Sequence, residues 1–317
     1  MTLDNILEEV KKASTIVVLT HENPDGDAIG SSLATYMVLK KLGKDVDVII
    51  PEYPKVFRFL PCTEEIKQEG KIENYDLAIS VDCATTNLLN GFLGYFENAK
   101  VKVSIDHHST NTMYADYNYI NPDSPACAQV LLSILEYFDV EIDKQIGTCL
   151  LTGIITDTGG FQYQSTTSET FEFAAELLKR GVNVSDIYKK VMNTKTRESF
   201  ELRKLAMNRL EFHADNRIVF TYITKQDMEQ IGAENGDCEG IVEEGRAIEG
   251  VEVSIFLKEA KTGGFKCSLR SNNYVNVSDV CMMFGGGGHF HAAGCKMNLP
   301  FEQVKERIIQ QAKMYIK

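Results

Sequence analysis

Residues 17–32 combine side chains that bind metal ions with a tight turn. An apolar, β-branched run ends just before His21, and a proline and a glycine then force a short loop that presents Asp25 and Asp27 ahead of a helical pattern. Two carboxylates that flank a glycine can reach two different metal ions, and the His21 imidazole can ligate one of them. The alternative is a helix-capping loop, in which Asp25 or Asp27 only accepts backbone N–H groups.

Acidic and imidazole side chains also follow two later apolar runs. One predicted strand ends at Asp82, and the next ends at Asp106, His107 and His108. Because a doubly wound sheet places the carboxyl ends of its strands on one edge, we expect these side chains to converge with the first loop. Carboxylates packed this closely repel one another unless cations neutralise them. Adjacent histidines point in different directions, so one imidazole can bind metal while the other faces substrate, and Asp106 can orient one of them.

These residues need a sheet to position them, and the sequence alternates strand-like with helix-like segments over roughly its first 180 residues. Strands are predicted at residues 15–19, 46–50, 75–81 and 101–105, and helices at 28–39, 126–137, 144–156 and 167–180. The last turn of the third helix leads into Asp157, with two glycines close behind it. The alternation predicts an α/β fold whose N-terminal domain is a doubly wound, mostly parallel sheet.

A smaller C-terminal α/β domain is predicted to follow. We expect residues 1–185 to form one domain, which contains the candidate metal ligands, 186–207 a helical connector and 208–317 a second domain, with a cleft between the two domains. In the second domain, strands are predicted at residues 209–213, 218–223, 249–258 and 264–270, and helices at 226–231, 239–247 and 301–315. The charges of the connector indicate a solvated helix face.

Two features of the second domain have residues suited to binding an anion. Arg270 and Ser271 end a predicted strand, where a guanidinium and a hydroxyl can fork onto phosphate oxygens. Four consecutive glycines, the last two being Gly287 and Gly288, precede His289 and can expose backbone N–H groups to an anion or a nucleobase. A flexible linker is the other interpretation of such a run, but apolar residues flank it on both sides.

The composition restricts the class of protein. With 317 residues, 44% hydrophobic and 25% charged, the chain is an ordinary globular protein with room for two cores. It has no apolar run long enough to span a bilayer, an N-terminus too acidic for a signal peptide, and eight cysteines without a C-x-x-C pair. We therefore expect a reduced, cytoplasmic protein without a membrane partner. A net charge of −12 argues against binding long duplex nucleic acid, which needs a broad basic surface.

Taken together, the N-terminal motifs resemble those of the DHH phosphoesterase family. All four family motifs are present in order, as His21-x-x-x-Asp25-x-Asp27, Asp82, Asp106-His107-His108 and Asp157. The resemblance implies two divalent ions, and Mn²⁺ suits such mixed carboxylate and imidazole ligands better than Mg²⁺ does. It implies one ion on His21, Asp25 and Asp82, and a second on Asp27, Asp82, His107 and Asp157, so that Asp82 bridges them. His108, with Asp106 behind it, would contact the phosphoryl group and stabilise or protonate the leaving oxygen.

The C-terminal pattern Gly-Gly-Gly-His-x-x-Ala-Ala-Gly resembles the DHH-associated C-terminal domain, so the resemblance covers nearly the whole chain. It implies a substrate-binding set of Arg270, Ser271, Gly287, Gly288 and His289. The length matches the stand-alone NrnA-like members, which hydrolyse short oligoribonucleotides (nanoRNA) to mononucleotides and 3′-phosphoadenosine-5′-phosphate (pAp) to AMP. The expected ligands are therefore short RNA oligonucleotides or small phosphorylated nucleotides. Two alternatives stay open, a soluble phosphodiesterase of cyclic di-AMP or its linear product pApA, and a non-catalytic nucleotide-binding sensor; a homodimer is also left open.

Overall fold

The computed structural model describes residues 3–260 and 263–317. Contacts divide the chain into two compact units, Met1–Thr194 and Lys195–Lys317. Each unit is built around its own six-stranded sheet. Within the two described stretches, no helix is long and apolar enough to cross a bilayer.

The sheet of the first unit has six parallel strands in the order β3-β2-β1-β4-β5-β6. The strands are β1 (Thr15–Leu19), β2 (Asp45–Ile49), β3 (Ile66–Lys67), β4 (Leu77–Val81), β5 (Val101–Asp106) and β6 (Tyr117–Ile120). The central strands β1 and β4 are almost wholly apolar, as strands buried on both faces must be. The chain leaves β1 for β2 on one side and later returns to β4 on the other, so the switch point of this doubly wound sheet lies between β1 and β4.

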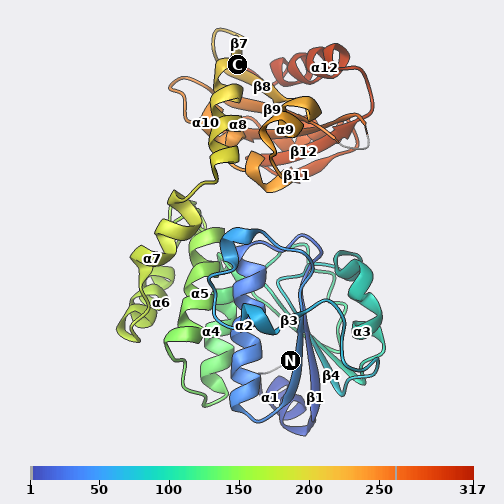
Figure 1. Ribbon diagram of the computed structural model, residues 1–317, viewed down its shortest axis with the longest axis vertical. Helices are drawn as coiled ribbons and strands as arrows, with labels where there is room; N and C mark the ends of the chain where they lie inside the picture. Colours follow the sequence, from blue (N-terminus) through green and yellow to red (C-terminus); the bar gives the residue numbers. More distant parts are fainter. Residues whose placement is uncertain (1–2, 261–262) are drawn as a thin grey trace. The chain divides into compact units, whose positions relative to one another are not determined.

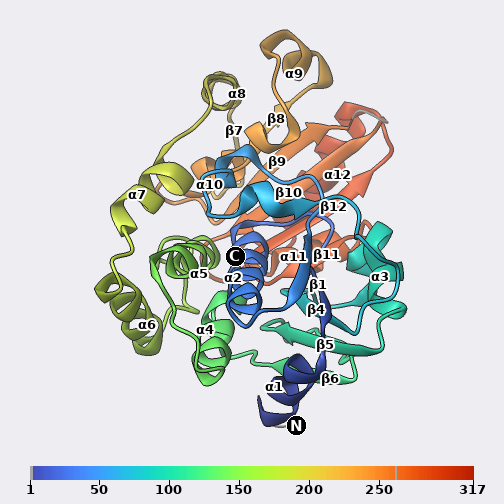
Figure 2. The same cartoon turned by 60° about the horizontal axis from the view of Figure 1, so that its bottom comes forward.

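Helices cover both faces of this sheet, as Figures 1 and 2 show. One face shares the larger core with α1 (Leu3–Lys12), α2 (Gly26–Lys41), α4 (Cys127–Tyr137) and α5 (Lys144–Asp157). The other face is covered by η3 (Thr86–Phe92) and α3 (Leu93–Glu97). Two more helices, α6 (Ser168–Lys179) and α7 (Val184–Tyr188), pack against α5, and the short turns η1 (Lys55–Phe57) and η2 (Thr63–Glu65) lie between β2 and β3.

Glycines set the distance between α2 and α5. A Cβ atom on Gly30 of α2 would lie 2.4 Å from the carbonyl oxygen of Cys149, and one on Gly153 of α5 would lie 2.5 Å from Asp27 Oδ1. Any side chain at these positions would push the two helices apart. This close packing therefore brings Asp27, at the start of α2, toward the end of α5, where Asp157 lies.

The sheet of the second unit is mixed, in the order β11-β12-β10-β9-β8-β7, with only β8 and β9 parallel among its neighbours. Its strands are β7 (Glu211–His213), β8 (Ile218–Ile223), β9 (Val253–Glu259), β10 (Phe265–Ser271), β11 (Gly287–His289) and β12 (Ala292–Met297). Its inner face packs on α11 (Val277–Met282) and α12 (Phe301–Lys313). Its outer face packs on α8 (Arg197–Asn208), α9 (Lys225–Ile231) and α10 (Ile241–Arg246), with the turn η5 (Asn235–Cys238) beside them.

The α/β architecture predicted from the sequence is confirmed, and the differences are local. Residues 186–207 do not form one separate connector, because α7 continues into a π-helical turn, η4 (Lys189–Asn193), in the first unit, whereas α8 packs in the second. The helices α1 and α11 and the strand β6 were not predicted. The glycine run is not a flexible linker, since its second half forms strand β11.

Candidate functional site

The eight N-terminal residues predicted to carry the chemistry gather at the carboxyl edge of the parallel sheet. They form three overlapping groups whose ligand atoms lie within 4.8 Å of one another, namely His21, Asp25 and Asp82; Asp27, His107 and Asp157; and Asp82, Asp106, His107 and His108. They come from the loops after β1, β4 and β5 and from the end of α5. This is the position at which a doubly wound sheet binds ligands, beside its switch point.

Asp82 lies between the first two groups. Its Oδ2 is 3.8 Å from His21 Nε2, and its Oδ1 is 3.4 Å from His107 Nε2. His107 Nε2 also lies 3.3 Å from Asp157 Oδ2 and 4.0 Å from Asp27 Oδ2. The two oxygens of one carboxylate thus face two different imidazoles, which is the arrangement that a carboxylate shared by two ions requires.

The donor set fits divalent cations. Asp82 Oδ1 and His107 Nε2 are buried and have no hydrogen-bond partner, although buried polar atoms are normally paired. Asp27 and Asp82 are buried too, at 0% and 2% exposure, so two carboxylates share a site nearly closed to water. Oxygen and imidazole donors that converge without partners are the chemistry of a divalent transition-metal site.

Crowding of the acids shifts their pKa values apart. Burial, and after it the charge of Asp82, raises the pKa of Asp27 to about 7. Burial and Asp27 likewise raise the pKa of Asp157 well above its ordinary value. Burial alone would raise the pKa of Asp82, but the neighbouring imidazoles of His107 and His21 outweigh it and lower that pKa. Burial would lower the pKa of His107, but Asp82 and Asp27 raise it to about 10. Carboxylates whose pKa values are raised in this way ionise more readily when cations bind beside them.

The capping and metal-binding interpretations of the first loop are compatible. Asp25 is the N-cap of α2, and its Oδ1 accepts the backbone N–H groups of Asp27 and Ala28 at 3.0 and 3.1 Å. Asp27 accepts the backbone N–H groups of Cys127 and Ala128 at the start of α4, at 2.5 and 2.9 Å. These bonds fix both carboxylates, while Asp25 keeps a second oxygen for the group that includes His21.

The His108 ring is positioned by the Asp106 carboxylate, which is positioned in turn by Asn111. Its Nδ1 lies 2.7 Å from Asp106 Oδ1, and Asn111 Nδ2 donates to Asp106 Oδ2 at 2.7 Å. Hydrogen bonding to Asp106 raises the pKa of His108. Its side chain is 36% exposed, so the imidazole is available to a ligand. Sequence reasoning missed Asn111, whose only signal is its place in the loop three residues after His108.

The backbone at Asp82 is strained. Its φ of 52° lies in the left-handed region, and its N–H group donates to the carbonyl of Ile105 at 3.0 Å. Non-glycine residues in this region are uncommon and concentrate at functional sites. The strain turns the Asp82 carboxylate away from the strand direction of β4 and toward both imidazoles.

In the second unit, strand β10 does not bring Arg270 and Ser271 together. Successive side chains of a strand point to opposite faces, and burial alternates along β10 accordingly. Ser271 is 1% exposed on the inner face, where its Oγ lies 2.9 Å from His291 Nδ1. Arg270 lies on the outer face, 2.9 Å from Glu243. The forked phosphate contact predicted for this pair is therefore not formed by the strand.

Arg270 instead shares the outer face with His289. Arg270 pairs with Ala292 across β10 and β12, and Ala292 pairs with His289 across β12 and β11. Directly paired residues of antiparallel strands share a face. Gly294 and Gly287, the next pair along, place only hydrogen atoms on that face. A cation and an exposed imidazole thus flank a floor of small residues on which a flat or anionic ligand can lie.

The glycine run has two structural roles. The N–H groups of Gly285 and Gly286 donate to the carbonyls of Met282 and Cys281 at the end of α11, both at 3.0 Å. These two N–H groups are therefore not free for an anion. A Cβ atom on Gly286 would lie 2.2 Å from the carbonyl oxygen of Gly294. Binding of a ligand by Gly287, at the edge of the small-residue floor, and by Gly288 stays a prediction.

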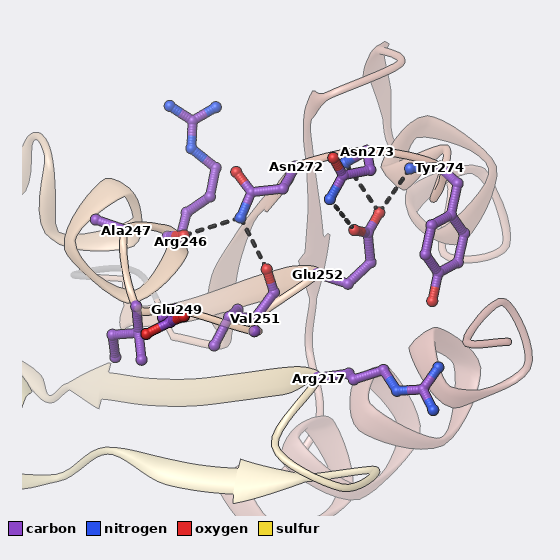
Figure 3. Close-up of a pocket in the computed structure, with 11 residues that line it drawn as sticks. Arg217, Arg246, Ala247, Glu249, Val251, Glu252, Asn272, Asn273 and Tyr274 are labelled. Carbon is purple, nitrogen blue, oxygen red and sulfur yellow. Dashed lines mark hydrogen bonds between the residues drawn. The ribbon is translucent and has the colours of Figure 1, made fainter.

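An open hollow of about 540 Å³ lies at another place in the second unit (Figure 3). Its wall includes a loop built on Glu252, whose buried carboxylate accepts the backbone N–H groups of Asn273, Tyr274 and Val275. Arg217 and Arg246 border it, but their guanidinium groups point in different directions and do not converge on one ligand. None of the predicted site residues lines it.

Comparison with known proteins agrees with these observations. The DHH family, N-terminal domain matches residues 15–154, and the DHHA1 domain matches residues 215–317. The chain is 33% identical over 313 residues to the bifunctional oligoribonuclease and PAP phosphatase NrnA of Thermus thermophilus, covering 96% of this chain and 92% of that protein. It is 27% identical to the cyclic-di-AMP phosphodiesterase PdeA of Listeria monocytogenes, covering 98% of this chain but 49% of that protein.

A solved structure is similar over the same extent. The crystal structure of an exopolyphosphatase-related protein from Bacteroides fragilis matches with a TM-score of 0.92 and 27% identity, covering 99% of this chain and 96% of that chain. The two domain matches occur in the same order as the two units, and the Thermus relative is similar along nearly its whole length. The chain therefore belongs to the DHH family of phosphoesterases, with the DHH and DHHA1 domains of its NrnA members.

Proposed function

We propose that the protein is a metal-dependent phosphoesterase that hydrolyses short oligoribonucleotides to mononucleotides and pAp to AMP. The observation that carries this proposal is the cluster of carboxylate and imidazole groups around Asp82, in which Asp82 Oδ1 and His107 Nε2 are buried without a hydrogen-bond partner. The relationship to the Thermus NrnA, over almost the full length of both chains, supports the choice of substrate class. The reaction takes place in the cytoplasm, where the eight cysteines, all free here, stay reduced.

Each residue of the first unit has a distinct role in the proposed reaction. Two divalent ions would be held by these side chains, one by His21, Asp25 and Asp82 and a second by Asp27, Asp82, His107 and Asp157. Mn²⁺ would suit this mixture of oxygen and nitrogen donors. When bound, the two ions supply positive charge for the phosphoryl oxygens and lower the pKa of an attacking water. His108 donates a hydrogen bond or a proton to the leaving oxygen, while Asp106 fixes its ring through Nδ1. Asn111 keeps Asp106 in place.

Arg270 and His289 bind the part of the nucleotide that does not react. Both lie on the outer face of the second sheet, beside the small side chain of Ala292. A guanidinium contacts a phosphate, and the flat floor accommodates a base or a ribose. Such binding acts equally on substrate and transition state, so it lowers KM more than it raises kcat.

A panel of substrates tests the proposal. With added Mn²⁺, we expect release of AMP from pAp and of mononucleotides from di- and triribonucleotides. The relationship to PdeA supports a second candidate, hydrolysis of cyclic di-AMP or pApA, and both compounds belong in the panel. Turnover of cyclic di-AMP alone would replace the first proposal by the second. Binding of all these nucleotides without turnover would identify a non-catalytic sensor.

Replacing Arg270 tests the binding role of the second unit. Arg270→Ala should raise KM for pAp about tenfold or more, with kcat changed only slightly. Lys266→Ala is the matched control, because Lys266 lies on the same face of β10 and is exposed. An unchanged KM in Arg270→Ala for every substrate would remove Arg270 from the binding surface.

A further inference from the structure

Arg270 is held in place from the side of helix α10. Its Nε donates to Glu243 Oε1 at 2.9 Å, and its Nη1 donates to the carbonyl of Leu269 at 3.0 Å. Both bonds join it to its own unit. They restrain a long side chain with many rotamers, and within the described residues no hydrogen bond is formed by Nη2. A guanidinium fixed at two donors loses less conformational entropy when the others bind a ligand.

A glycine places Glu243 above this part of the sheet. A Cβ atom on Gly245, two residues further along α10, would lie 2.5 Å from Ser254 Oγ on β9. Ser254 is the direct partner of Arg270 across β9 and β10. Close packing of α10 on the sheet at Gly245 therefore brings Glu243 to the row of residues that continues through Arg270 and Ala292 to His289.

The Arg270–Glu243 pair is not a fully satisfied structural ion pair. Glu243 Oε2 is buried and has no hydrogen-bond partner, and neither has the buried Ser254 Oγ. An arginine and a carboxylate that serve stability alone usually form two parallel bonds. The side chains of Arg270 and Glu243 are still 28% and 34% exposed, so a ligand on the outer face can reach the guanidinium. A carboxylate oxygen left unpaired in this way is costly to keep, which points to a role beyond folding.

We propose that Glu243 is a positioning residue for substrate capture. By holding Nε of Arg270, it keeps the remaining N–H groups of the guanidinium available on the outer face that Ala292 and His289 share. The group that these N–H donors bind is a phosphate of the nucleotide. This inference rests on the proposed function, because it assigns a partner to the residue that binds the unreacting end of the substrate.

The test compares five variants of the full chain with pAp and Mn²⁺. Glu243→Ala should raise KM about tenfold while kcat stays within about twofold. Glu243→Gln keeps an acceptor oxygen for Nε and should recover most of the affinity. Glu244→Ala is the matched control, since Glu244 is the next residue of α10 but pairs with Arg203. It should leave KM unchanged.

A double variant separates positioning from a general loss of structure. If Glu243 acts through Arg270, the variant with both residues replaced by alanine should have the KM of Arg270→Ala alone, because the two effects are not additive. Fully additive effects, or a normal KM in Glu243→Ala, would overturn the inference. Equal thermal melting temperatures of Glu243→Ala and Glu244→Ala exclude unfolding as the cause.

Failure of the positioning role of Glu243 can be distinguished from failure of the proposed hydrolase function. If the unmodified protein hydrolysed neither pAp nor short RNA, that function would be wrong, and equilibrium binding of AMP would then decide the inference. Glu243→Ala should weaken AMP binding as much as Arg270→Ala does. Unchanged AMP binding in Glu243→Ala, with weakened binding in Arg270→Ala, would reject the positioning role.

Discussion

The candidate metal ligands of the first unit depend on one another, because Asp82 lies between them. Each of its two oxygens faces a different imidazole, and its left-handed backbone holds it in that place. Asp27 and His107 lie on one side of it, and His21 on the other. Loss of one member therefore leaves uncompensated charge on its neighbours, which is more damaging than the loss of an isolated ligand.

Replacing a member of this set should abolish most of the activity. Asp27→Asn or His107→Ala should lower kcat by about 10²-fold or more. Each substitution removes a donor from the same proposed metal site. Steady-state kinetics on pAp with saturating Mn²⁺ measures the effect. Excess EDTA should have the same effect on the unmodified protein, and Mn²⁺ should restore activity better than Mg²⁺. Full activity in EDTA would contradict the two-metal assignment.

The binding of Mn²⁺ should depend on pH in a predictable direction. The pKa of Asp27 is raised to about 7 in the metal-free protein, so below that pH an ion must displace its proton. The affinity for Mn²⁺ should therefore increase between about pH 6 and pH 8, with more protons released at the lower pH. Isothermal titration calorimetry in buffers of different ionisation enthalpy measures both quantities. Equal proton release at the two pH values would show that Asp27 is not a ligand.

The raised pKa of Asp27 should make the metal-free protein less stable as the pH rises, whereas the affinity for Mn²⁺ should increase. Between the ordinary pKa of an aspartate and about 7, the folded state binds a proton at Asp27 that the unfolded state does not. The contribution of this group to stability is therefore present below the unfolded pKa and is lost as the pH rises through about 7. Chelated protein should melt at a lower temperature at about pH 8 than at about pH 6, and Mn²⁺ should raise the melting temperature more at the higher pH.

At the scale of elements, close packing through glycine recurs in both units. Gly30 and Gly153 let α2 approach α5, and Gly245 lets α10 approach β9. In each case the helix that comes close carries or neighbours a site residue. The glycines thus act on function through the distance between elements rather than through flexibility.

The glycine run allows a matched test of this point. Gly286→Ala should destabilise the protein by about 2 to 3 kcal/mol, because its Cβ would meet the backbone oxygen of Gly294 at 2.2 Å. Gly287→Ala meets nothing within 4 Å, so it should melt normally, but its methyl group would stand on the floor beside Ala292 and raise KM. Thermal melting and pAp kinetics separate the two effects. Equal melting temperatures for both variants would contradict the packing argument.

The acids at the strand ends were predictable, whereas their supporting residues were not. Asp82 and Asp106 follow apolar runs, and parallel strands bring such ends to one edge. Asn111 and Glu243 were missed because each acts through a side chain that only the folded loop or helix brings near. Strand β11 was missed because glycine has little preference for strands.

The joint phosphate contact predicted for Arg270 and Ser271 differs from the structure for another reason. Their adjacency in sequence favoured a joint phosphate contact, but strand alternation places Ser271 against His291 on the inner face. The period of two was available in the sequence and would have separated the two residues. That Arg270 and His289 lie on one face depends instead on the register of three strands, which the sequence pattern does not specify.

Over the whole molecule, charge argues for short substrates. The net charge is −12, and several other arginines are paired with carboxylates, namely Arg180 with Glu176, Arg203 with Glu244 and Arg209 with Asp227. A protein that follows a long strand needs a basic groove with stacking aromatic residues. Added nucleotides should therefore meet repulsion without gaining contacts.

A length series of one homopolymer RNA measures this effect. We expect the highest kcat/KM for chains of roughly two to five nucleotides and a steep fall beyond them. The series is run at fixed Mn²⁺ and fixed salt, because ionic strength alone changes such affinities. Equal or rising efficiency up to chains of roughly 20 nucleotides would favour a processive exonuclease instead.

The parallel order of the first sheet also means that the candidate metal site should be completed late in folding. The strands β1, β4 and β5, whose ends carry candidate metal ligands, are separated in sequence by whole crossover connections, and Asp157 follows two further helices. Such distant pairings are slow, because the entropy of closing the chain is lost before any contact is gained. A nascent chain that stops before β4 has His21, Asp25 and Asp27 but neither Asp82 nor His107. Metal ions bound at this site would therefore stabilise the finished sheet rather than guide the order in which its strands assemble.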